Sequence, residues 1–92
     1  MAELEGDWEL QRLSGFLPPL AGMRKQIRGD RGATVLPGGL RVPFVVVAHE
    51  LRYRPPFSTV VDVLEPDGEG WHGRATVFGR TLGEFRMSRR AT

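Results

Sequence analysis

The residues with the clearest capacity for chemistry are the two histidines, His49 and His72, and the carboxylates that accompany them in the chain. A histidine beside a carboxylate can act as a general acid or base or as a metal ligand. Neither histidine belongs to a spacing such as His-x-x-x-His. No nucleophile-elbow sequence surrounds Ser58, which with His49 and Asp62 would complete a Ser-His-Asp set. We therefore expect no catalytic site, no metal site and no cofactor.

A second set of polar residues lies among aromatic and aliphatic ones in the middle and C-terminal parts of the chain. Apolar walls with a few convergent polar groups are the general form of a small-ligand site. The alternative is a plain apolar core with a ladder of exposed charges outside it. The predicted ligand-binding residues are Phe44, Tyr53, Asp62, Trp71, Arg74, Phe85 and Met87.

Strands must position most of these residues. Residues 57–65, 71–78 and 82–88 are rich in the Val, Thr and aromatic side chains that suit a pleated, half-buried surface. The segments between them, PDGEG at 66–70 and GRT at 79–81, carry the Pro, Asp and Gly residues typical of tight turns. This pattern predicts a three-stranded antiparallel meander.

The register of the first hairpin decides which side chains face the core. If Asp62 pairs with Arg74, these two lie together on one face and Val63 lies on the other with Trp71 and Phe85. A slip of one residue reverses every side chain of a strand. The register therefore decides whether Asp62 and Arg74 are exposed surface residues or polar groups that line a cavity. Continued through a three-residue loop at 79–81, the pairing of Asp62 with Arg74 predicts an apolar face of Val61, Val63, Trp71, Gly73, Ala75, Val77, Gly83, Phe85 and Met87. A two-residue loop at 79–80 would instead put Phe85 and Met87 on the face of Asp62 and Arg74.

The N-terminal half supplies the remaining elements. Residues 7–13, 33–36 and 40–53 are predicted as strands, the last with an apolar centre on both faces. Residues 19–28 are predicted as a short helix, because Pro19 suits a first helical position and Gly29 a helix end. The whole chain is then mainly β, a small antiparallel up-and-down barrel or strongly curved sheet of about six strands with one short helix.

Composition narrows the classes of function. The 92 residues make one domain, with a formal net charge of +2 and no cysteine. This charge excess is too small for a nucleic-acid-binding face, and neither a signal peptide nor a membrane-spanning segment is visible. We expect a cytoplasmic protein with neither nucleic acid nor a membrane as partner. The short basic run around Lys25 is interpreted as a solvated helix face.

The opening Gly6-Asp7-Trp8, followed by an excursion and then a β-meander, resembles the Gly-x-Trp strand of lipocalin-like calycin barrels. The resemblance implies a ligand-binding β-barrel in which Trp8 closes the narrow end. Typical lipocalins are longer and have more strands. It therefore implies a shortened relative, or one that completes its barrel by dimerising.

Three functions follow as hypotheses. The first is a non-catalytic, homodimeric binder of a small apolar or amphipathic ligand, whose anionic group would meet Arg74 or Arg52. The second is an assembly module that uses an exposed sheet edge near Pro43 or the apolar run at 42–48. The third is a small β-barrel cyclase or isomerase with Asp62, His49 or Tyr53 as acid or base.

Overall fold

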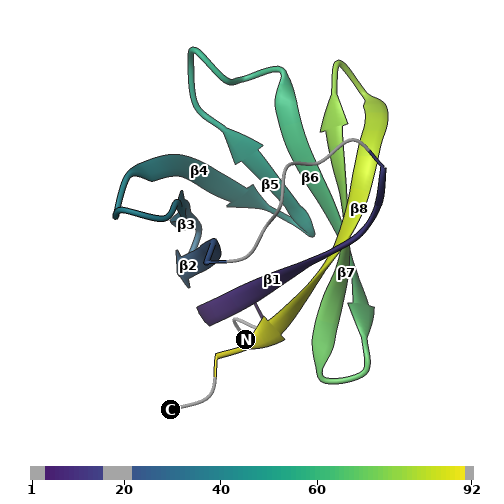
Figure 1. Cartoon of the computed structure of the whole chain (residues 1–92). Helices are drawn as coiled ribbons and strands as arrows, with labels where there is room; N and C mark the ends of the chain where they lie inside the picture. Colours follow the sequence, from purple (N-terminus) through teal and green to yellow (C-terminus); the bar gives the residue numbers. More distant parts are fainter. Residues whose placement is uncertain (1–3, 16–21, 91–92) are drawn as a thin grey trace.

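The computed structural model describes residues 4–15 and 22–90, and these residues form a closed antiparallel barrel of eight strands (Figure 1). Each strand pairs with its neighbour in sequence, and the last strand pairs with the first. The predicted small antiparallel barrel is therefore confirmed. Its strands are β1 (Gly6–Gly15), β2 (Arg24–Arg28), β3 (Arg31–Val35), β4 (Arg41–Val47), β5 (Glu50–Tyr53), β6 (Val60–Asp67), β7 (Gly70–Val77) and β8 (Arg80–Arg89).

The predicted helix at 19–28 is wrong for the part that the structure describes, where β2 occupies Arg24–Arg28. Residues 19–21 lie outside the described residues. Lys25 and Ile27 are buried while their neighbours in β2 are more exposed, so the true period is two. Gly29, with φ of 66°, reverses the chain in a hairpin turn with Asp30 and does not end a helix. Within 4–15 and 22–90 there is no helix long and apolar enough to cross a membrane.

The structure has eight strands where the sequence predicted about six. One added strand is β2, and the other arises because the predicted strand at 40–53 is divided into β4 and β5 by a turn at Ala48-His49. Ala48 takes φ of 54°, an uncommon backbone conformation for alanine, so its residue type did not indicate a turn. Pro43 is not at an edge, since β4 pairs with β3 on one side and β5 on the other. Assembly through an exposed edge there is therefore excluded.

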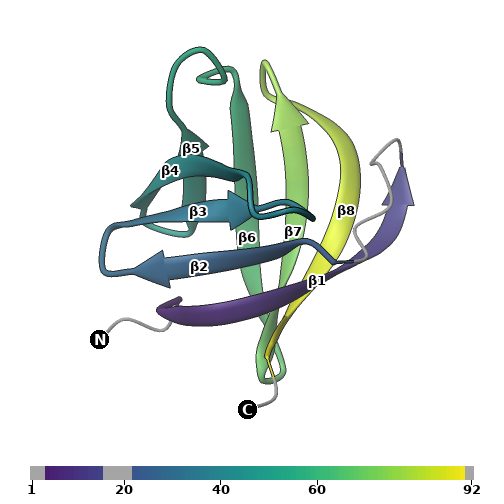
Figure 2. The ribbon, with the colours of Figure 1, turned by 60° about the vertical axis from the view of Figure 1, so that its left-hand side comes forward.

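The first strand closes the barrel by pairing with two partners in succession. It pairs with β2 from Gly6 to Glu9, and with β8 from Trp8 to Gly15 (Figure 2). β2 begins at Arg24, so beyond the pair of Glu9 with Arg24 the strand β1 has no partner in β2 and continues along β8. An opening between β1 and β2 results.

The predicted register of the first meander hairpin is wrong by one residue. Its turn is Gly68-Glu69 alone, so Asp62 pairs with Ala75 and Arg74 pairs with Val63. Asp62 therefore faces the barrel interior, while Val63 and Arg74 face outward, as does Val61. The predicted grouping of Trp71, Phe85 and Met87 on one face holds, because β7 pairs Trp71 with Met87 and Gly73 with Phe85.

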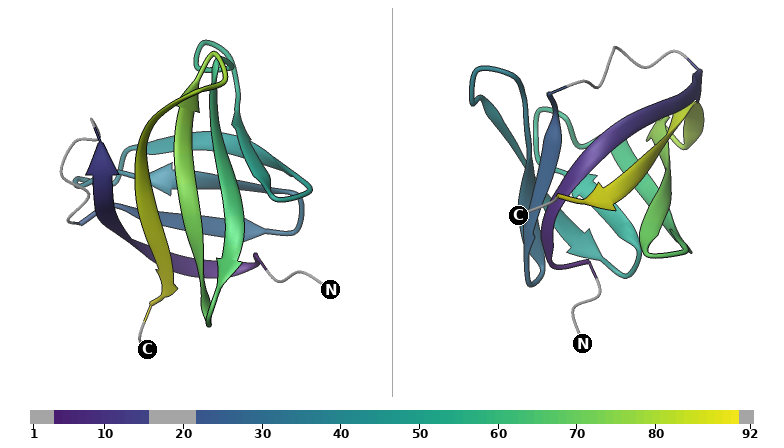
Figure 3. Two further views of the ribbon diagram at one scale, coloured as in Figure 1. Left: turned by 90° about the vertical axis from the view of Figure 1, so that its right-hand side faces the viewer. Right: turned by 60° about the horizontal axis from the view of Figure 1, so that its bottom comes forward.

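The core fills the barrel between two crossed groups of strands. In the left view of Figure 3, β6, β7 and β8 lie side by side, and β2, β3 and β4 cross behind them. The buried hydrophobic cluster is Leu4, Trp8, Ile27, Phe44, Leu51, Leu64, Trp71, Phe85 and Met87. Trp8 donates its indole N–H to the Leu4 carbonyl at 2.8 Å, and the Arg89 guanidinium stacks 4.4 Å from its ring centroid.

Two adjacent residues of β6 test the register. Val63→Lys is expected to change the free energy of unfolding by less than about 1 kcal/mol, since that side chain faces outward. Leu64→Lys should cost more than about 3 kcal/mol or prevent folding, because Leu64 is 2% exposed and an unpaired charge would be buried. Urea denaturation followed by circular dichroism measures both. The reverse order of the two effects would restore the register predicted from the sequence.

Candidate functional site

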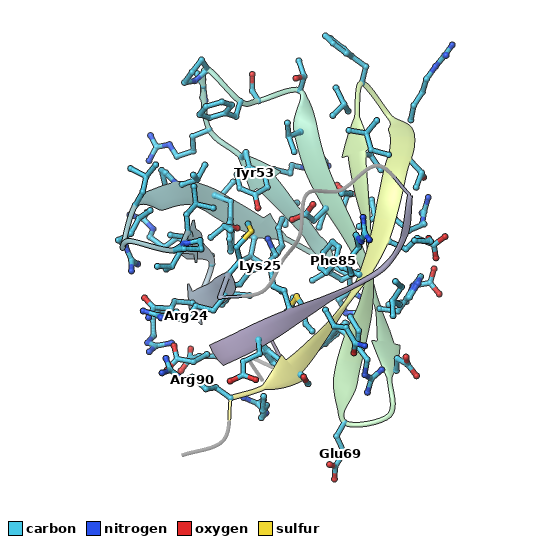
Figure 4. The ribbon with its side chains drawn as sticks, viewed as in Figure 1. Arg24, Lys25, Tyr53, Glu69, Phe85 and Arg90 are labelled. Carbon is cyan, nitrogen blue, oxygen red and sulfur yellow. The ribbon has the colours of Figure 1, made fainter. Side chains whose placement is uncertain are left out.

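The barrel interior holds a charged network that joins four strands. Lys25 Nζ, from β2, donates to Thr34 Oγ1 at 2.7 Å and to Tyr53 Oη at 2.8 Å, and lies 2.9 Å from Asp62 Oδ2. Figure 4 shows Lys25 pointing into the barrel between Tyr53 and Phe85. Lys25 and Asp62 are 3% and 4% exposed, so both charges are shielded from water.

The hydrogen bonds of this network run in one direction and end on the carboxylate. Tyr53 Oη donates to Asp62 Oδ2 at 3.1 Å. Tyr53 must therefore accept the proton in its 2.5 Å contact with Thr34 Oγ1. The three N–H donors of Lys25 meet three acceptors, and its ammonium also lies about 5.5 Å from the ring centroids of Phe44 and Phe85. The network is thus satisfied without a ligand.

Both titratable groups that donate into the network hold their protons more tightly than usual. Burial by itself lowers the pKa of Lys25, but the charge of Asp62 and the contact with Tyr53 outweigh it and leave that pKa above its ordinary value. Burial raises the pKa of Tyr53, and the neighbouring Lys25 offsets this only in part. At neutral pH Lys25 is therefore an ammonium and Tyr53 a neutral phenol, and neither acts as a base.

The predicted ligand-binding residues divide into two groups. Six of them face the interior and Arg74 does not: it lies outside opposite Glu84 and donates to Thr81 Oγ1 at 3.3 Å. Lys25 and Thr34 were missed, because the predicted helix placed Lys25 on a solvated face. No sequence signal marks Lys25 as buried, because Ile27 is the one apolar residue of Arg24–Arg28 and the alternation is seen only in the burial of the strand. The six residues turned inward are Phe44, Tyr53, Asp62, Trp71, Phe85 and Met87.

Two acid and base candidates of the cyclase hypothesis, Asp62 and Tyr53, lie together in the interior network, and the third, His49, lies apart from them. His49 is exposed in the β4–β5 turn, with its ring edge-on to Trp71 at 4.9 Å between centroids. His72 lies on the outside and contacts Glu84 at 2.7 Å. Among the described residues no group of His, Asp and Glu side chains is arranged to hold a metal ion.

At the opening between β1 and β2, side chains that contact the core also border a hollow. Leu10 and Met23 pack against the core yet remain partly exposed. They line a hollow of about 300 Å³ together with Arg24 and Arg90. Arg24 Nε is buried there and has no hydrogen-bond partner among the described residues. An unpaired buried donor is costly, so this hollow favours an acceptor that can pair with it. We call it the β1–β2 opening, lined by Glu9, Leu10, Gly22, Met23, Arg24 and Arg90.

Removal of one charge should show how strongly the interior network is coupled. Lys25→Met is expected to lower the free energy of unfolding by about 3–5 kcal/mol, because it leaves Asp62 buried without a counter-charge. The double variant Lys25→Met, Asp62→Leu should recover a large part of this loss, even if the single variant does not fold. Urea denaturation measures each.

The matched control for Lys25→Met is Arg86→Met, which removes the exposed contact of Arg86 with Asp67. It should cost less than about 1 kcal/mol. Equal losses for Lys25→Met and Arg86→Met, or a double variant less stable than Lys25→Met, would show that the buried pair is not coupled.

The pH dependence of stability tests the same network through Lys25 and Tyr53, which are the single lysine and the single tyrosine of the chain. The pKa of each is higher in the folded than in the unfolded protein. Their stabilisation is therefore complete below about pH 10 and is lost as the pH rises further. Urea denaturation across alkaline pH should show this fall, and tyrosinate absorbance should report ionisation of Tyr53 delayed until unfolding. Free ionisation of Tyr53 in the folded protein near its ordinary pKa would contradict the network.

Comparison of the chain with protein-family models, with curated proteins and with solved structures gives no match in any of the three. The small barrel that the calycin resemblance implied is present, and membership of that group remains a resemblance.

Proposed function

We propose that this protein is a non-catalytic binder of a small amphipathic anion, which it takes up at the β1–β2 opening. The observation that carries the proposal is the hollow beside the start of β2, beyond the pair of Glu9 with Arg24. It leaves Leu10 and Met23 partly exposed although both contact the core. An apolar ligand chain placed against them removes that surface from water, which is favourable by about 25 cal/mol per Å².

The charges at the opening support an anionic head group. Among the described residues that line the hollow, Arg24 and Arg90 accompany one carboxylate, Glu9, so two cations face one anion. The excess of one positive charge suits a monoanion such as a carboxylate. Arg24 Nε lacks a hydrogen-bond partner, and guanidinium groups pair well with carboxylate oxygens. The volume of about 300 Å³ lies at the small end of the range for ligand pockets, about 300–1,000 Å³.

The interior network supports binding over catalysis. A general base must reach the proton that it abstracts, and Asp62 is held by Lys25 at 2.9 Å deep in the barrel. Lys25 keeps its proton and is therefore not a nucleophile. The cyclase or isomerase hypothesis thus has no acid or base in the β1–β2 opening beyond Glu9.

Homodimerisation and a cytoplasmic location remain proposals that rest on the sequence. Val47 at the end of β4 supports the first, because its side chain points outward and is 44% exposed. Light scattering over a wide concentration range tests it, and a monomer throughout would oppose it. The lack of cysteine supports the second.

The binding proposal is tested with decanoate, whose chain suits the apolar part of the opening. Millimolar decanoate should raise the melting temperature, because a ligand that binds only the folded state stabilises it. Arg24→Gln should weaken decanoate binding roughly 10-fold, in line with about 1.5–3 kcal/mol for a charged hydrogen bond.

Decanol of the same chain length and the variant Arg80→Gln, in the distant β7–β8 turn, are the controls. The proposal fails if decanoate leaves the melting temperature unchanged, if decanol raises it equally, or if both arginine variants lose the same affinity.

A further inference from the structure

A second hollow lies on the outer wall of the barrel, across β2, β3 and β4, and is independent of the β1–β2 opening. It has a volume of about 470 Å³, within the usual range for small-ligand pockets. We call it the arginine groove. It is lined by Gln26, Arg28, Arg31, Gly32, Ala33, Arg41, Pro43, Phe44, Val45 and Arg54.

Its floor is apolar and belongs to regular strands. Ala33 of β3 pairs with Pro43 of β4, and Val45 pairs with Arg31 one step along the same ladder. Odd-numbered residues of both strands face outward here, since Phe44 and Thr34 face the interior. Ala33, Pro43 and Val45 thus form a floor on which a flat apolar group can lie, and the strand pairing keeps that floor rigid.

Four arginines surround this floor. Arg28 and Arg31 stand directly opposite each other at the end of the β2–β3 hairpin. Like charges directly opposite in an antiparallel pair are destabilising. Arg41 lies at the start of β4, and Arg54 follows β5.

The local acids neutralise only part of this charge. Arg28 lies 3.3 Å from Asp7, and Arg31 lies 3.6 Å from Asp30. Arg41 donates to the neutral Gln26 at 2.6 Å. Arg54 has no side-chain hydrogen bond or ion pair with any residue in the described ranges. A third carboxylate, Glu5, accepts a hydrogen bond from Gly29 N at 3.0 Å in the same hairpin. Four cations thus meet three carboxylates, and the charge around the groove remains positive.

We propose that the arginine groove binds an organic phosphate monoester with a flat apolar body. A phosphate monoester carries nearly two negative charges at neutral pH and three acceptor oxygens, which suits a positively charged hollow lined by several guanidinium groups. The phosphate lies between Arg28, Arg31 and Arg54, and the apolar body lies on Ala33, Pro43 and Val45. Binding relieves the repulsion between Arg28 and Arg31.

Charge argues against two other occupants of the groove. A second copy docked through the same face would set four arginines against four. Nucleic acid needs a broad basic face, and the whole chain carries a net charge of only +2. A small phosphate ester pairs with the excess positive charge of the groove. It brings no further arginines and needs no broad basic face.

Phenyl phosphate is the probe, with phenol and inorganic phosphate as its two halves. Titration calorimetry should give binding of phenyl phosphate that is at least about 10-fold tighter than that of either half. The double variant Arg31→Gln, Arg54→Gln should weaken phenyl phosphate binding by about 10-fold or more. The control Arg80→Gln, Arg86→Gln removes the same charge from β8 and should change it by less than about 2-fold.

Three results would overturn the proposal. The first is an equal loss of affinity in the two double variants, which would indicate general charge attraction. The second is equal affinity for phenyl phosphate and for one of its halves. The third is tighter binding of a short single-stranded oligonucleotide than of phenyl phosphate. Amide chemical shifts of β3 and β4 that follow the titration would support it. Because the variants do not alter the β1–β2 opening, failure here leaves decanoate binding intact.

Discussion

The buried pair of Lys25 and Asp62 is the constraint on which the rest of the barrel depends. An ammonium enclosed by aromatic rings is tolerable only if every donor finds an acceptor, and those acceptors come from β3, β5 and β6. Burial of such a pair contributes little net stability compared with apolar side chains. It does select the register, because a slip of one residue in β2 or β6 would turn one charge outward and leave the other unpaired.

The same network explains why the candidate sites lie in the barrel wall. Eight strands enclose about enough space for side chains, and here Lys25, Tyr53 and the aromatic core occupy it. Both hollows are formed by the strands of the barrel wall. β1 leaves β2 to follow β8, which produces the β1–β2 opening. On the outer face, arginines of β2, β3 and β4 border the small apolar residues of β3 and β4, which produces the arginine groove.

Much of the barrel is predictable from local patterns. The Val-, Thr- and aromatic-rich segments of β6, β7 and β8 lie within a few residues of their predicted bounds, because alternation and Gly-containing turns are local signals. Two elements were not predictable in this way. Residues 24–28 also fit a helical spacing, and Ala48 reverses the chain without being a turn-forming type. The hairpin from β6 to β7 was misread by one residue, since PDGEG permits turns of several lengths and its proline belongs to β6.

Local chemistry alone determined that this chain would form short antiparallel strands around an aromatic core, and that Trp71, Phe85 and Met87 would share one face. Only closure of the sheet decided which polar groups lie inside. Closure pairs Lys25 with Asp62 in the interior and places Arg74 on the outside of the barrel. The physical reason is that side-chain direction in a strand depends on register, and register here is selected by contacts between strands far apart in sequence. No window of neighbouring residues contains that information.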